Sequence, residues 1–162
     1  MKKLVVAVIL LFAVSISMAA IDVEKEKKEV KKVVYDAVEF IKKTGKDEAY
    51  KYLQKTDKEG NKFYVGDKYP FVFTMNSAQD KSVCLVHPAS PKLVGQDMIN
   101  VMDSHKKYFI RDFVKVAQSK EGEGWVDYYW THPISKKVKL KSSFIKKLDN
   151  ETYVGCGVYM EE

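Results

Sequence analysis

The sequence predicts a single α+β domain in which one long helix packs on an antiparallel sheet. Three observations predict it. Apolar residues recur at helical spacing before Gly45, five aromatic or β-branched segments follow, and short connections join the last three of these segments. Short connections favour antiparallel neighbours. The 162 residues are the length of one domain, and 46% of them are hydrophobic, which is enough to form a core.

The first residues have the pattern of a secretory signal peptide and are not expected to be part of the folded domain. A basic start, Met1–Lys3, precedes the unbroken apolar run Leu4–Val14, and Ser17–Ala19 offers small residues for cleavage. We expect cleavage near Ala19, which leaves residues 20–162 as one domain in the periplasm or outside the cell. The alternative is an uncleaved membrane anchor, because the apolar stretch continues to Ile21.

The charge of the chain argues against nucleic acid as a partner. The formal net charge is +6, and removal of Lys2 and Lys3 with the signal leaves 6 − 2 = +4. Acids lie between most of the lysines, so the pattern is typical of a solvated surface. An exported chain without a nucleic-acid-binding motif is not expected to meet DNA or RNA. Attraction to anionic small molecules or to a membrane surface stays open.

The helices are expected at three places. The main one, from Val23 to Lys43, has the apolar face Val30, Val33, Val34, Ala37, Val38 and Ile41, and Gly45 ends it. A short second helix would bury Ala49, Tyr50 and Leu53. A further amphipathic stretch covers Lys107–Gln118 and ends before two glycines.

The strands are expected in two groups. Tyr69–Met75 and Ser82–His87 flank a turn over Asn76–Asp80 and would form a hairpin with a longer loop. Pro88 and Pro91 then force an irregular segment. The last three strands are expected at Trp125–Thr131, Val138–Leu148 and Tyr153–Met160.

The segment GWVDYYWTHP carries both tryptophans of the chain. Alternation places Trp125, Asp127 and Tyr129 on one side of the strand and Tyr128 and Trp130 on the other. A carboxylate in a packed core would be costly without a partner. We therefore place Tyr128 and Trp130 on the face that the 88–118 segment covers, where a pocket could form.

No catalytic or metal-binding motif emerges, so we expect no enzyme, no cofactor and no metal. The three histidines lack the spacing of metal ligands. Cys84 and Cys156 could form one disulfide or serve as small buried hydrophobes. Alternation puts Cys84 and His87 on opposite faces of one strand, which argues against a nucleophile pair.

Four segments taken together resemble single Cache domains, the extracytoplasmic PAS-like sensor modules of bacterial chemoreceptors and histidine kinases. They are GDKYPFVFTMN, LVHPASPKLVGQDMINVMD, GWVDYYWTHP and KSSFIKKLDNETYVGCGVY. The resemblance implies a Cache fold, with a long N-terminal helix on a five-stranded antiparallel sheet of order 2-1-5-4-3. It also implies a small ligand, such as an organic acid or amino acid, between the sheet and its covering loops. In that order strand 1 separates Cys84 from Cys156, so a disulfide is not expected.

The resemblance also supplies the candidate site. It assigns Tyr128 and Trp130 to the pocket wall, and Lys141, which precedes its Ser-Ser-aromatic step, to the carboxylate of a ligand; the alternatives are core packing and a solvent lysine. His87 could donate to a ligand or hold its loop. Phe71 and Phe73 share one side of their strand and could wall the pocket or fill the core. Gly155 and Gly157 indicate close approach, either by a ligand or by Tyr128 and Trp130.

The expected function is extracytoplasmic binding of a small, anionic metabolite, in or alongside chemotaxis and signal transduction. The best-known members continue into membrane helices and a cytoplasmic signalling region, whereas this chain resembles the stand-alone secreted form. A membrane receptor or histidine kinase is therefore an expected partner. The alternative is a protein-interaction module with a vestigial pocket that docks on such a receptor.

Overall fold

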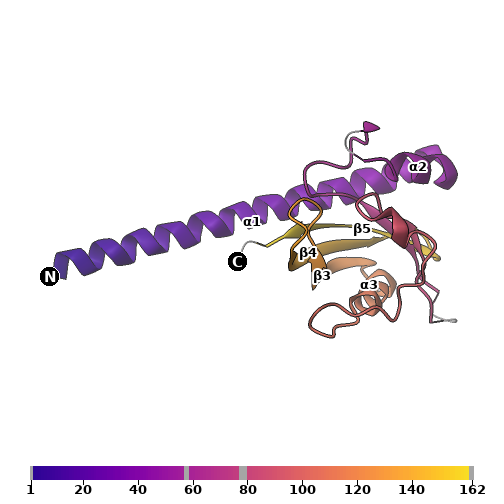
Figure 1. Cartoon of the computed structure of the whole chain (residues 1–162). Helices are drawn as coiled ribbons and strands as arrows, with labels where there is room; N and C mark the ends of the chain where they lie inside the picture. The colour runs from indigo at the N-terminus through magenta and orange to yellow at the C-terminus, as the bar shows by residue number, and fades with distance from the viewer. Residues whose placement is uncertain (1, 57–58, 77–79, 161–162) are drawn as a thin grey trace.

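Helices lie on both faces of one five-stranded sheet (Figure 1). The computed structural model of the chain describes residues 2–56, 59–76 and 80–160, with side chains from Asp22 onward. Most of the turn predicted over 76–80 and the side chains of the expected signal peptide lie outside the described residues. Within them, no helix is long and apolar enough to cross a membrane.

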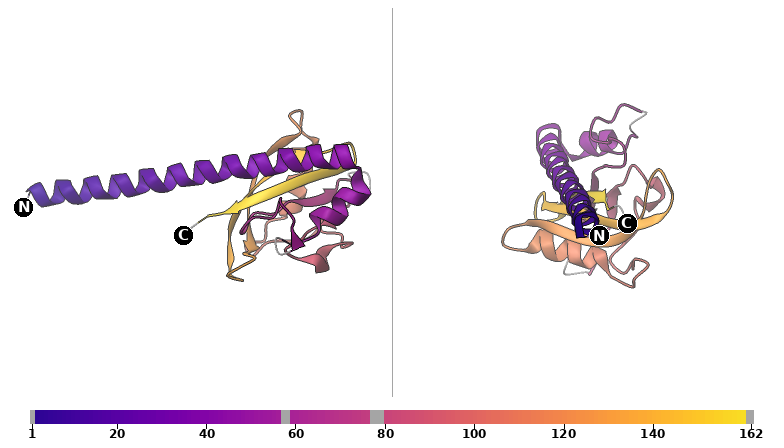
Figure 2. Two further views of the ribbon diagram at one scale, coloured as in Figure 1. Left: turned by 90° about the horizontal axis from the view of Figure 1, so that it is seen from above. Right: turned by 90° about the vertical axis from the view of Figure 1, so that its left-hand side faces the viewer.

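Helix α1 (Lys2–Thr44) forms the first layer. It starts earlier than the predicted range 23–43, since the expected signal segment is helical too. This N-terminal part of the helix projects beyond the rest of the domain (Figures 1 and 2). Gly45 ends it with φ of 89°, as predicted. Helix α2 (Lys46–Leu53) follows and buries Ala49 and Leu53.

The sheet has the order β2-β1-β5-β4-β3, and all neighbouring strands are antiparallel, as the resemblance implied. Its strands are β1 (Phe71–Thr74), β2 (Cys84–Val86), β3 (Glu123–Thr131), β4 (Val138–Lys147) and β5 (Thr152–Tyr159). β1 and β2 are shorter than predicted, whereas the last three lie within a few residues of their predicted ranges. β5 is central, and all of its residues are buried.

The two faces of the sheet have separate cores. The α1 side packs helix residues such as Val34 and Ile41 on Val72, Phe144 and Val158. The opposite side is covered by the one-turn 3-10 helix η3 (Pro91–Leu93), the irregular segment after it and α3 (Phe109–Gln118). Figure 2 shows α3 on the face opposite α1. There the aromatic residues of β1 and β3 meet those of α3.

The cysteines lie on opposite faces of the sheet. Cys84 belongs to the α3-side core and Cys156 to the α1-side core, and both are free and buried. Burial raises the pKa of the Cys84 thiol to about 12 and that of Cys156 to about 11. The expectation that they form no disulfide is confirmed.

The expected opposition of Cys84 and His87 is wrong. Val72 pairs with Val86 but Phe73 pairs with Cys84, so β2 carries one extra residue at that step. This bulge resets the alternation. Cys84 joins the α3-side core, and the His87 ring packs on Phe71 of that same side. The raised pKa of the Cys84 thiol still disfavours a thiolate nucleophile.

Candidate functional site

Tyr128 and Trp130 of β3 lie on the α3 side of the sheet, as their alternation with the exposed Asp127 predicted. Tyr128 is buried, stacks on Phe109 with ring centres 4.4 Å apart, and its hydroxyl lies 3.1 Å from the Ser143 hydroxyl. Trp130 is half-buried and packs edge-on against Phe109 at 5.4 Å. Both rings are therefore held by α3.

The cavity between the sheet and α3 is small. Its volume is about 10 Å³, which is room for roughly one water molecule. Phe71 and Phe113 stack across it with ring centres 5.6 Å apart. Its lining contains Phe71, Phe73, His87, Leu93, Met98, Phe109, Ile110, Phe113, Tyr128 and Trp130. Five of the six sequence-predicted site residues thus surround one slot.

Lys141, the sixth, lies next to this slot but does not line it. The side chain is 1% exposed, and its Nζ donates to the Tyr69 hydroxyl at 3.0 Å. The same Nζ lies 4.1 Å from the Tyr69 ring centre, 4.8 Å from that of Tyr159 and 5.9 Å from that of Phe71. Phe71 therefore contacts both the ammonium group and the slot.

The charge of Lys141 has no acidic partner within 4 Å among the described residues. Burial lowers the pKa of its ammonium group to about 8. Asp67 acts on this pKa only through longer-range electrostatics. Its carboxylate lies 3.8 Å from Lys68 Nζ and 3.5 Å from His132 Nε2. The alternative of a solvent lysine is excluded by its burial.

His87 is the second buried titratable group here. It is 4% exposed, and its Nδ1 has no hydrogen-bond partner among the described residues. Burial, followed by the charge of Lys141, lowers its pKa to about 3, so the ring is neutral near pH 7. A neutral imidazole with a free nitrogen can accept or donate one hydrogen bond, depending on its tautomer.

The loop at His87 is held by Gln54 rather than by the histidine ring. The Gln54 side chain accepts from the His87 backbone N–H at 2.8 Å and donates to its carbonyl at 3.2 Å. Gln54 is the C-cap of α2, so the helical layer fixes one end of the slot. No sequence signal pointed to Gln54. Tyr69, also missed, shares its side with Phe71 and Phe73, so alternation along the predicted strand could have found it.

The glycines of β5 mark close approach, but by other groups than expected. A side chain at Gly155 would meet the Phe71 ring, and one at Gly157 would meet Ser143 Oγ and Lys141 Cε. The expectation of a ligand or of Tyr128 and Trp130 above them is therefore corrected. The two glycines let a ring and a lysine stem lie flat on the central strand.

Other polar side chains near the sheet hold loops. His132 Nδ1 accepts from the backbone N–H groups of Ile134 and Ser135, at 3.2 and 3.1 Å. Asp97 accepts from Ser82 and Ile99, and Asp103 accepts from the backbone N–H of His105, Lys107 and Tyr129. Across the described residues, no three His, Cys, Asp or Glu side chains are grouped as metal ligands.

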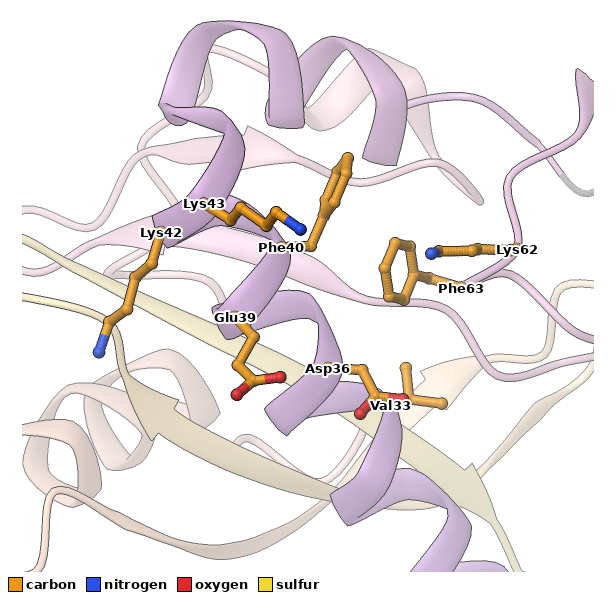
Figure 3. A pocket seen from close by; sticks show the side chains of 8 residues that line it. All are labelled: Val33, Asp36, Glu39, Phe40, Lys42, Lys43, Lys62 and Phe63. Atoms are coloured by element: carbon orange, nitrogen blue, oxygen red, sulfur yellow. The ribbon is translucent and has the colours of Figure 1, made fainter.

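A hollow larger than the slot lies elsewhere on the surface. A groove of about 860 Å³ runs beside α1 and the 62–63 segment, with Phe40 and Phe63 as its aromatic floor, 5.3 Å apart (Figure 3). Charges of both signs surround it, with Asp36 and Glu39 on one side and Lys62 over the rings. No buried group without a partner faces it, in the part of the chain described, so it offers less specific chemistry than the slot.

Comparisons with known proteins agree with this architecture. The family model of single Cache domain 2 matches residues 13–162. A methyl-accepting chemotaxis protein from Vibrio parahaemolyticus RIMD 2210633 has a similar structure, with a TM-score of 0.72, 18% identity, and coverage of 90% of this chain and 96% of that one.

Two further solved structures are similar. A periplasmic sensor domain of a chemotaxis protein has a TM-score of 0.64 and 25% identity, covering 83% of this chain and 97% of the other. A Cache chemosensory domain described for carboxylic acid recognition has a TM-score of 0.66 and 21% identity, covering 85% and 95%. At 18% and 21% identity, the first and third establish only the fold. The family match covers most of the sequence, and the chain belongs to the single Cache domain 2 family.

Proposed function

We propose that this Cache domain binds a small carboxylate between the sheet and α3, with the Lys141 ammonium group as its counter-charge. Phe71, Phe73, Tyr128 and Trp130 would form the walls, and His87 would supply one hydrogen bond. The observation that carries the proposal is the buried Lys141 without an acidic partner among the described residues. The solved Cache domain that recognises carboxylic acids supports the same ligand class.

The energetics of Lys141 favour such a ligand. Removing an ammonium group from water costs several kcal/mol, which one tyrosine hydroxyl and the faces of aromatic rings offset only in part. A carboxylate beside Nζ would restore the missing charge and accept a strong hydrogen bond. Because the slot holds about one water, Phe71 or the half-buried Trp130 must move to admit a larger ligand.

Calorimetric titration with propionate and with propionamide, its uncharged counterpart, tests the proposal. We expect the wild type to bind propionate more tightly than the amide. Lys141→Met, which keeps a stem over Gly157 but removes the charge, should weaken propionate binding by about 1.5–3 kcal/mol. Lys147→Met makes the same change further along β4 and should have no effect. Equal affinity of wild type and Lys141→Met for propionate would refute the assignment.

A second candidate function is favoured by the small volume of the slot. A pocket that side chains have filled is what a protein-interaction module with a vestigial pocket would contain. Such a module would dock on a membrane receptor or histidine kinase without a ligand. Absence of binding to every small acid, amino acid and amine by a folded protein would favour this function.

We propose that the domain is exported to the periplasm or out of the cell, where it presents its ligand to a membrane receptor or histidine kinase. The basic start, apolar run and small residues before Ala20 support export. Intact-mass measurement of the protein from the exported fraction should give a chain that begins at Ala20. A mass that still includes residues 1–19 would favour the membrane anchor instead.

A further inference from the structure

Exposed aliphatic side chains gather where the β3–β4 connection meets the turn before β1. Ile134 is 68% exposed, Val138 52% and Val65 64%, the three largest values among the exposed large hydrophobic side chains described. The two turns are in contact, because His132 Nε2 lies 3.5 Å from the Asp67 carboxylate. We call the group Val65, Ile134, Lys136, Lys137 and Val138 the hairpin surface.

The hairpin surface is basic as well as apolar. Lys136 and Lys137 are exposed, and from Tyr128 to Leu148 the sequence contains no acidic residue. Asp67, an acid in contact with this region, is engaged by His132 and Lys68, and Lys68 also pairs with Glu26 and Glu29 of α1. Exposed aliphatic groups beside lysines are the combination that binds to the headgroup layer of an anionic bilayer.

The position of this surface fits a bilayer too. Lys68 Nζ pairs with Glu26 of α1 at 3.3 Å, so the turn lies where α1 enters the domain. The N-terminal part of α1, which includes the apolar run Leu4–Val14, projects from this same end (Figures 1 and 2). The export signal proposed above would place this end of the domain toward the membrane in the precursor.

We propose that the hairpin surface binds the domain peripherally to an anionic lipid bilayer. Ile134, at the tip of the connection, enters the layer between headgroups and acyl chains, while Lys136 and Lys137 lie among the anionic headgroups. This contact is independent of any ligand in the slot. It holds the exported domain at the membrane, where receptors are reached by diffusion in two dimensions.

Vesicle co-sedimentation tests the proposal with the protein collected from the exported fraction. We expect binding to phosphatidylcholine vesicles that contain phosphatidylglycerol, decreasing with added salt, and none to phosphatidylcholine alone. The pair Lys136→Gln and Lys137→Gln should weaken binding on the order of twentyfold or more, at about fivefold for each lysine. Ile134→Ser should weaken it on the order of tenfold.

A matched control and a second measurement show whether binding depends on this surface. The pair Lys115→Gln and Lys120→Gln removes the same charge near the far end of β3 and should leave binding unchanged. An equal loss in that control, or no binding to anionic vesicles, would overturn the proposal. So would a dimer in lipid-free sedimentation velocity that Ile134→Ser converts to a monomer, because the surface would then join two copies of the chain.

Discussion

The buried charge of Lys141 makes the stability of the domain depend on pH. Its pKa is lowered from 10.5 to about 8 by burial, so between these values the unfolded chain binds more protons than the folded chain. The Lys141 contribution to the free energy of unfolding therefore rises with pH across this window, by about 3 kcal/mol in full. Above about pH 9 the buried thiols, whose pKa values are raised, act in the opposite direction.

The first prediction isolates this contribution by difference. Lys141→Met should have a larger free energy of unfolding than the wild type at pH 7, because no buried charge remains. The gap should narrow from pH 8 to pH 9 as the wild-type ammonium group loses its proton. Urea unfolding of both proteins at pH 7, 8 and 9 measures it, and a gap that stays constant would contradict the assigned pKa.

The second prediction is that buried His87 makes the folded domain less stable in acid. Its pKa falls from 6.5 to about 3 on folding, because of burial and the nearby Lys141 charge. Below pH 6.5 the unfolded chain binds a proton that the folded chain does not, so stability is lost as pH falls toward 3. Between pH 7 and pH 4.5 the loss should reach about 2–3 kcal/mol.

His87→Phe is the control for this second prediction, because it keeps a ring against Phe71 and Trp130 without a titratable group. Other carboxyl groups, such as Asp103, have lowered pKa values and also reduce stability in acid. The measured quantity is therefore the difference between the two proteins in urea unfolding at each pH. Equal losses in both would show that His87 is not the sensitive group.

For single residues, the sequence could predict which face of the sheet a side chain lies on, but not how deeply the side chain is buried. Alternation placed Tyr128 and Trp130 correctly because β3 is regular over nine residues. The burial of Lys141 followed only from the resemblance, since five other lysines lie within ten positions of it on either side. The bulge in β2 could not be predicted from alternation, because an extra residue leaves the composition unchanged.

At the scale of elements, β5 is the part of the fold with the least tolerance for added volume. Gly155 lies against the Phe71 ring and 2.8 Å from Ile145 Cδ1 at the position of an added Cβ. At Gly157 the added atom would lie 2.5 Å from Lys141 Cε and 2.9 Å from the Ser142 carbonyl oxygen. Central-strand backbone cannot shift without disturbing both neighbours.

The third prediction follows from these distances. Gly155→Ala and Gly157→Ala should each lower the free energy of unfolding by about 1–3 kcal/mol through overpacking. Gly124→Ala on the edge strand is the matched control, because its added Cβ would meet only Val116, at 3.2 Å. It should cost less than about 1 kcal/mol. Thermal unfolding of the three variants measures the order, and an equal cost in all three would contradict it.

Elements with strong periodicity were predicted well, and those fixed by tertiary contacts were not. The six apolar positions of α1 repeat at helical spacing and predicted its buried face. β1 ended one residue before its predicted run did, and β2 began two residues after the start of its own. At this point the Ser82 hydroxyl donates to the Thr74 carbonyl, and Thr74 Oγ1 accepts from the Val83 N–H. α3 began two residues late because Asp103 holds the Lys107 backbone.

At the scale of the whole molecule, the strand order could not be derived from the residues alone. Local patterns specify strands and short connections, but the long crossover from β2 to β3 leaves several orders possible. The resemblance supplied the order, and with it the placement of Phe71 from β1 and Lys141 from β4 on either side of β5. The candidate site therefore depends on the strand order, because that order brings together residues that are far apart in the sequence.

The last prediction concerns the stability of the complete domain with its ligand. A ligand that binds only the folded state at 100 times its Kd adds about 2.7 kcal/mol to the free energy of unfolding. For a domain of this size, that should raise the Tm by roughly 5–10 °C.

A thermal-shift screen of small acids, amino acids and amines measures this rise, with the amide of each active acid and Lys141→Met as controls. A rise with acids in the wild type, absent in both controls, is the signature of the proposed sensor. A flat screen on a folded protein would instead favour the interaction module, because a vestigial pocket couples no ligand to unfolding.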